Sequence, residues 1–316
     1  MLLGKFSRFV KRYDLTFTPR HTGAARLNIV DGNTLPSVLK ALHRAIQNNK
    51  ASTVTANGDE VELLQAVHDE KRNTVVLLFH RGSPNAADPM YRKKDKKSRL
   101  VTVRAATKAV DEEQSLSAHF VISTKPDSAG RYKSALEEVP GISLAAIVPI
   151  IASALREYPY DYTDKRGQSA ETYCMVKSAG IKSATLADSL KRGHINYLTL
   201  IRPADPNLVD AEGIFHPMDQ RMKIKIDKTT LDNKGFFDKL GDYIKGAQDE
   251  GWEHFDVDVT FENERHRTIK VERDQAAQEV LFVKAEEVTV AKELSLCTTT
   301  IVDELVGHMI GVMQRV

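Results

Sequence analysis

Apolar and polar residues alternate with a period of two through most of the first half of the chain, which is typical of half-buried β-strands. Gly, Pro, Asn and Asp separate these segments and indicate turns. One segment instead repeats its apolar residues at helical spacing, as Leu35, Leu39, Leu42 and Ile46 show. Strands are predicted at 6–18, 26–30, 53–56, 61–70, 74–81, 100–105, 115–124 and 132–138.

The second half combines strands with longer helical patterns. A helix is expected to begin near Ser143, and the polar stretch 160–169 is interpreted as a linker. These patterns predict an α+β protein of two domains, 1–160 and 161–316, with mixed or antiparallel sheets and flanking helices. Beyond the linker, helices are predicted at 183–192, at 236–247 and near the C-terminus, and strands at 172–176, 195–201, 220–227, 255–262 and 267–273.

The amino-acid composition limits the possible folds and partners but does not indicate a function. The chain has 316 residues, of which 41% are hydrophobic and 28% are charged, so two domains can each bury a core. Lysine and arginine total 45 against 43 acidic residues, and this balance of +2 does not by itself indicate a nucleic-acid partner. Cys174 and Cys297 are far apart and form neither a disulfide framework nor a zinc motif.

The N-terminus and the longest apolar stretch bear on location. Basic residues interrupt the N-terminal apolar residues, so no signal peptide is expected. The longest apolar stretch, 142–155, is shorter than the roughly 20 residues that span a bilayer. We therefore expect a cytoplasmic protein.

Motifs for nucleotide binding, hydrolysis and metal binding are missing from the sequence. It lacks both glycine-rich phosphate loops, the zinc motif HExxH and the nucleophile motif GxSxG. Its ten histidines include no HxH or helical i,i+4 pair. We therefore nominate no catalytic residue, no metal ligand and no cofactor.

A pair of carboxylates on one predicted strand gives the enzyme alternative. Asp256 and Asp258 share a face of the strand, with Glu262 further along it, and such a group can hold a divalent metal in a nuclease. The competing interpretation is a solvated outer face whose carboxylates balance nearby cations, and this is the one that we expect.

The strongest local signal is a basic run in the predicted loop 82–99. Only Asp95 opposes the cations of 92–99, and a loop of this charge can grip phosphates. Alternatively, the charge keeps the edge of a sheet from aggregating. The candidate residues are Arg92, Lys93, Lys94, Lys96, Lys97 and Arg99.

A second basic group follows from strand geometry. In the strand 220–227, Met222 and Ile224 alternate with cations, so three cations are expected in a row on the exposed face. These cations either contact phosphates or pair with carboxylates such as Asp256 and Asp258 on a neighbouring strand. The candidate residues are Arg221, Lys223 and Lys225.

The C-terminal helix, placed at 297–314, has an apolar surface wider than a single stripe. Leu305 and Met309 lie beside Val306 and Ile310 on it. Such a helix is either buried in its own domain or forms the contact of a homodimer.

The order of elements in the second half resembles the RexA-like family of DNA-binding proteins from phage exclusion systems. The resemblance rests on LKRGH (190–194) between a helix and a strand, and on DEEQSL (111–116) and FVI (120–122) before the helix at Ser143. It implies a two-domain dimer that binds duplex DNA largely without sequence specificity. It also implies a role in phage exclusion or antiphage defence with a membrane-protein partner, but no individual residue carries over, because no motif aligns the DNA contacts.

Together these observations predict a non-enzymatic, homodimeric protein that binds double-stranded DNA through its two basic groups. Two alternatives stay open: a metal-dependent nuclease that uses Asp256 and Asp258, and an adaptor whose basic loop pairs with an acidic protein surface.

Overall fold

The chain folds into two compact units. Unit 1 comprises Met1–Ile181 together with Ala285–Val316, and unit 2 comprises Lys182–Lys284. This division differs from the predicted boundary at 160, because residues 160–181 still contribute strands to unit 1 and the chain returns to it for its last strand and helix. The computed structural model describes residues 3–30, 36–95, 100–181, 184–185, 194–204, 218–226, 233–260, 266–271, 281–282 and 285–315.

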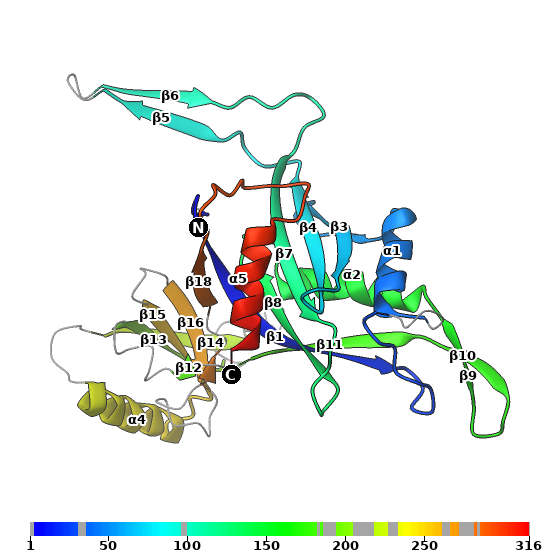
Figure 1. Cartoon of the computed structure of the whole chain (residues 1–316). Coiled ribbons are helices and arrows are strands. Elements are labelled where there is room, and N and C mark those ends of the chain that lie inside the picture. The colour runs from blue at the N-terminus through cyan, green and yellow to red at the C-terminus, as the bar shows by residue number, and fades with distance from the viewer. Residues whose placement is uncertain are drawn as a thin grey trace, which may run out of the picture. The chain divides into compact units, whose positions relative to one another are not determined.

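Unit 1 is built on one large antiparallel sheet, which confirms the α+β prediction (Figure 1). Its strands follow the order β11-β1-β8-β7-β4-β3-β2, and β18 also pairs with β1. The predicted strand at 26–30 is only an isolated bridge at Asn28. The strands are β1 (Ser7–Pro19), β2 (Ser52–Val54), β3 (Glu60–Asp69), β4 (Thr74–Ser83), β7 (Gln114–Ser123), β8 (Arg131–Glu137), β11 (Cys174–Gly180) and β18 (Ala285–Thr289).

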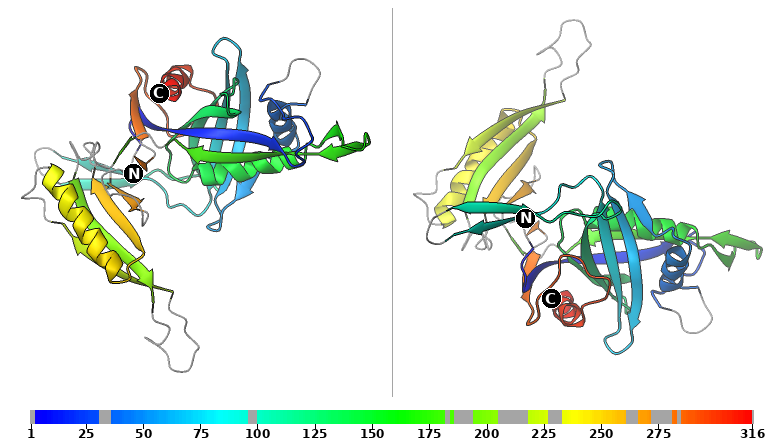
Figure 2. Two further views of the ribbon diagram at one scale, coloured as in Figure 1. Left: turned by 90° about the horizontal axis from the view of Figure 1, so that it is seen from below. Right: turned by 90° about the horizontal axis from the view of Figure 1, so that it is seen from above.

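Helices cover both faces of this sheet. α1 (Val38–Gln47) and α2 (Leu144–Arg156) pack on the face that carries Leu15 and Phe120. Ser37 caps α1, since its hydroxyl accepts a hydrogen bond from the amide of Lys40 at 3.2 Å. α5 (Asp303–Gln314) packs on the opposite face, as the two views of Figure 2 show.

The C-terminal helix is buried by its own chain. Leu305, Met309 and Val312 are each at most 1% exposed, and they pack on Val10 and Val121 of the sheet. The helix begins at Asp303 rather than at 297. The apolar positions that suggested a dimer contact are therefore covered within unit 1, and the homodimer stays a prediction to which this helix adds no support.

The polar stretch interpreted as a linker is a hairpin instead. β9 (Tyr160–Thr163) pairs with β10 (Ser169–Thr172) across a turn at Gly167, whose φ of 79° suits glycine. Because most side chains of both strands are polar, the sequence shows no alternation of apolar and polar residues that would have predicted these strands. Among the described residues, no helix is long and apolar enough to cross a membrane.

In the described residues of unit 2, a four-stranded antiparallel sheet is covered by the helix α4; the predicted helix at 183–192 lies largely outside the described residues. α4 (Asn233–Asp249) places Leu240, Ile244 and Ala247 against buried residues of the sheet, including Phe255 and Val257. The order is β14-β13-β15-β16. The strands are β13 (His194–Pro203), β14 (Asp219–Lys225), β15 (His254–Thr260) and β16 (His266–Val271), and β12 (Ala184–Thr185) pairs separately with β17 (Leu281–Phe282).

Unit 2 is inserted into what would otherwise be a single strand. β11 and β18 pair with the same edge of β1: Gly180 lies opposite Tyr13, the amide of Ile181 donates to the carbonyl of Arg12, and Ala285 lies opposite Lys11. The chain thus leaves this edge and returns to it at consecutive positions. Unit 1 has the register of an uninterrupted strand.

Deleting residues 182–284 and joining Ile181 to Ala285 is expected to leave unit 1 folded, because the joined strand keeps its register against β1. Cooperative thermal unfolding, followed by circular dichroism, measures this. The matched control deletes 181–284. It shifts β18 by one residue and turns Val288 and Val290 out of the core, so it is expected to unfold at a lower temperature. Equal stability of the two deletions would contradict the insertion.

Candidate functional site

A two-stranded ribbon extends from the large sheet of unit 1 (Figure 1). β5 (Met90–Lys94) and β6 (Val101–Ala105) pair with each other and interrupt the connection between the neighbouring strands β4 and β7. We call residues 90–105 the arm. The predicted loop 82–99 was wrong over 90–94, because a dense run of charge hid the strand. Lys96, Lys97 and Arg99 lie outside the described residues.

The register divides the described side chains of the arm between two faces. Directly paired residues of an antiparallel ribbon share a face. The valine face comprises Met90, Arg92, Lys94, Val101, Val103 and Ala105, and the tyrosine face comprises Tyr91, Lys93, Thr102 and Arg104. On the tyrosine face, the guanidinium carbon of Arg104 lies 5.4 Å from the ring centre of Tyr91. Both faces therefore carry two cations.

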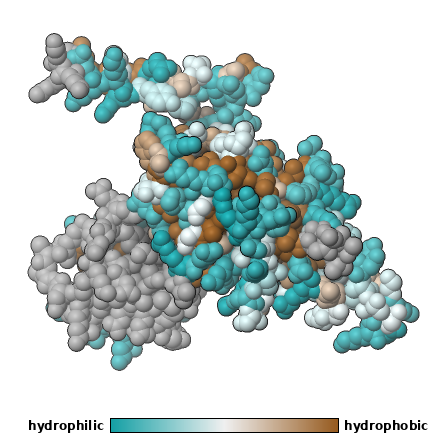
Figure 3. Space-filling view, in the orientation of Figure 1, coloured by the Kyte–Doolittle hydropathy of each residue, from teal (hydrophilic) through white to brown (hydrophobic). Residues whose placement is uncertain are grey.

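Every described residue of β5 and β6 is exposed. The apolar residues of the arm share this exposure: Tyr91 and Val103 are each 57% exposed, and Leu100, just before β6, is 70% exposed. Figure 3 accordingly shows hydrophilic and hydrophobic residues mixed along the arm. A free two-stranded ribbon is marginal in water, and exposed apolar residues rimmed by charge mark interaction sites. The arm has the character of a binding element.

The cations of β5 are free to meet a ligand. Arg92, Lys93 and Lys94 have no acidic partner among the described residues. Arg81, at the base of the arm, differs because its guanidinium binds Asp59 at 2.5 Å and the carbonyl of Pro140 at 3.1 Å. Hydrogen bonds from Arg81 hold the pKa of Asp59 below its usual value. The cations of β5 thus stay available for a ligand, whereas Arg81 at the base of the arm does not.

The second predicted basic group is exposed but partly neutralised. Arg221, Lys223 and Lys225 all lie on the exposed side of β14, as the alternation predicted. Arg221 pairs with Asp219 at 3.1 Å. The ammonium of Lys223 lies 3.4 Å from a carboxylate oxygen of Asp258 and 4.2 Å from the ring centre of Tyr197. Lys225 has no ion-pair partner in the described part of the chain.

The two carboxylates of the nuclease alternative lie on the same side of the sheet as the cations of β14, with β13 between the two strands. Asp256 and Asp258 lie on one face of β15, where Asp258 pairs with Lys223 and accepts a hydrogen bond from Thr268. Glu262 lies outside the described residues. Within the described ranges, no three His, Cys, Asp or Glu side chains gather as a metal site would require. These contacts favour the solvated, charge-balanced face.

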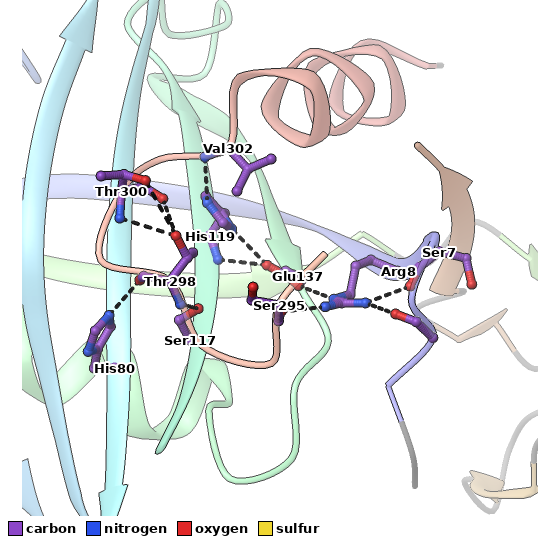
Figure 4. A network of polar contacts seen from close by, with 11 residues as sticks. Ser7, Arg8, His80, Ser117, His119, Glu137, Ser295, Thr298, Thr300 and Val302 are labelled. Carbon is purple, nitrogen blue, oxygen red and sulfur yellow. Dashed lines mark hydrogen bonds and ion pairs between the residues drawn. The ribbon is translucent and has the colours of Figure 1, made fainter. Parts of the chain in front are cut away.

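A buried polar network that the sequence did not reveal lies elsewhere in unit 1 (Figure 4). Glu137 on β8 accepts hydrogen bonds from Arg8 Nε at 2.7 Å, and from the backbone amide and Nδ1 of His119 at 3.0 and 2.8 Å. The amide of Val302 donates to Nε2 of His119 at 3.1 Å. The Nδ1 of His119 therefore carries the proton. The three side chains of the network, Arg8, His119 and Glu137, come from β1, β7 and β8. No local sequence motif could therefore have revealed the network.

This network stabilises the packing of neighbouring segments and does not have the arrangement of a catalytic dyad. Both ring nitrogens of His119 already form hydrogen bonds within the protein, and the Glu137 side chain is only 3% exposed. We call residues 290–302 the strap: Arg8 Nη2 donates to the carbonyl of Ser295 at 2.9 Å, and Ser117 accepts a bond from the amide of Thr298 at 3.0 Å. The network holds the strap and α5 on the sheet.

The cysteines do not supply a reactive centre in the core. Cys174 is 1% exposed, and burial raises the pKa of its thiol to about 12, so it stays protonated at neutral pH. Cys297 lies in the strap, with its sulfur 3.2 Å from the hydroxyl of Ser115.

Comparisons with protein-family models, with curated proteins and with solved structures found no match for this chain. The resemblance to RexA-like proteins therefore stays an expectation from the sequence. The case for a function rests on the geometry of the arm.

Proposed function

We propose that this protein is a non-enzymatic, largely sequence-independent double-stranded DNA-binding protein that contacts the phosphate backbone through the arm. One observation carries the proposal. The arm is an exposed ribbon whose Arg92, Lys93 and Lys94 lack acidic partners among the described residues, while its neighbour Arg81 is fully engaged. Cations that neutralise phosphates release counterions, and this supplies affinity without reading bases.

The cations of β14 are proposed as a weaker, second contact. Lys225 is exposed and has no described partner, whereas Arg221 and Lys223 would first have to leave Asp219 and Asp258. A homodimer would place two arms on one duplex and raise the affinity through their linkage. The dimer, the role in phage exclusion or defence and the membrane-protein partner stay predictions.

The test is a salt series with the whole protein and a fluorescent duplex of arbitrary sequence, read by anisotropy with and without magnesium. We expect the logarithm of the affinity to fall linearly with the logarithm of the salt concentration, with a slope of about −3 or steeper if three or more phosphates are neutralised. The duplex should stay intact in magnesium, as denaturing gels would show.

The other outcomes separate the alternatives. Cleavage in magnesium that disappears when Asp256 and Asp258 are replaced by alanine would establish the nuclease. If the protein did not bind the duplex even at about 50 mM salt, phosphate contacts with counterion release would be excluded. This result would favour the adaptor with an acidic protein partner.

A further inference from the structure

The arm carries its positive charge on both of its faces. Arg92 and Lys94 project from the valine face, and Lys93 and Arg104 from the tyrosine face. A ribbon that lay flat on a single phosphate backbone would use the cations of only one face. Two cations on each face suit a ribbon that has a row of phosphates on either side.

Duplex DNA offers two phosphate rows where its strands border a groove. The major groove of B-form DNA is about 12 Å wide and admits a two-stranded β-ribbon, whereas the minor groove is only about 6 Å wide. The major groove of A-form RNA is too narrow for protein side chains to read. As a two-stranded ribbon with cations on both faces, the arm suits the major groove of B-form DNA.

The apolar side chains of the arm suit the same location. Val101 and Val103 lie directly opposite Lys94 and Arg92 on the valine face, and both valines are about half exposed. The major groove presents the methyl groups of thymine, which apolar side chains can contact. A purely electrostatic contact outside the groove would leave these residues in water.

We infer that the arm enters the major groove of B-form duplex DNA, with Arg92 and Lys94 directed to one phosphate row and Lys93 and Arg104 to the other. The inference rests on the proposed DNA-binding function and adds the form of nucleic acid and the groove.

Two double variants of the whole protein, matched in charge, test the geometry: Arg92→Ala with Lys94→Ala, and Lys93→Ala with Arg104→Ala. Insertion predicts that each pair loses about two phosphate contacts, so each salt slope becomes shallower by roughly 1.8. If the salt slope changed for only one of the two double variants, the ribbon would lie flat on a single phosphate backbone. That result would overturn the inference, although the proposed DNA binding would stand.

A second measurement tests the groove with the unaltered protein. Duplexes of one sequence are compared with cytosine unmodified and with glucosylated 5-hydroxymethylcytosine, whose sugars fill the major groove. We expect binding to weaken at least tenfold on the glucosylated duplex and on an RNA duplex of that sequence, and to persist in netropsin, a minor-groove ligand. Equal binding to both DNA duplexes would overturn the inference alone, and no binding to any duplex would overturn the proposed function as well.

Discussion

Replacing Glu137 by alanine is expected to lower the free energy of unfolding of unit 1 by about 3 to 5 kcal/mol, because it leaves a buried cation without its partner. The side chain of Arg8 is only 2% exposed, and its Nε would lose the carboxylate of Glu137. His119 would lose the acceptor for its Nδ1 proton at the same site. Urea denaturation followed by circular dichroism measures the change.

Glutamine at this position is expected to be destabilising too, despite its similar shape. Nε2 of His119 must accept from the amide of Val302, so the ring cannot switch its proton to meet a side-chain amide. The matched control is Glu138→Ala at the next residue, whose carboxylate pairs with Lys11 at 2.6 Å where both side chains are partly exposed. That change should cost only about 0 to 1 kcal/mol. Equal losses at the two positions would contradict the role given to the buried network.

The alternation of apolar residues was sufficient to place most strands of the large sheet, because one face of each must reach a core. The segments 61–70, 74–81 and 115–124 correspond closely to β3, β4 and β7. Where charged residues fill a strand that has no buried face, this signal is absent. β5 was missed for that reason, whereas the hairpin β9–β10 was missed because polar residues dominate both of its strands.

Contacts between distant segments were beyond sequence reasoning. The insertion of unit 2 depends on the pairing of β11 and β18 with one edge of β1. The composition of the linkers does not indicate this pairing. The network around Glu137 joins residues as far apart as Arg8 and Val302. By contrast, the cations of β14 could be placed on one strand face from their spacing, and pairing with Asp258 was one of the two alternatives; only the pair of Arg221 with Asp219 emerges from the fold alone.

The variant Arg92→Ala, Lys93→Ala, Lys94→Ala is expected to bind duplex DNA about 10² to 10³ times more weakly than the natural protein at roughly 0.1 M salt. Each neutralised phosphate contributes about 0.9 to the salt slope, so the loss of three contacts makes the slope shallower by roughly 2.7. Since these side chains are exposed, the thermal stability of unit 1 should not change. Anisotropy across a salt series gives both the affinity and the slope.

Two further triple variants show whether the position of the charge matters. Lys71, Lys125 and Lys133 are exposed lysines at the end of the sheet opposite the arm, since β7 runs from Gln114 beside the arm to Ser123. Replacing these three lysines by alanine removes the same charge and should change the affinity less than threefold. Alanine at Arg221, Lys223 and Lys225 should weaken binding on the order of tenfold, as expected for one free cation. If all three variants lost affinity equally, DNA would respond to net charge alone and the arm would have no special part in binding.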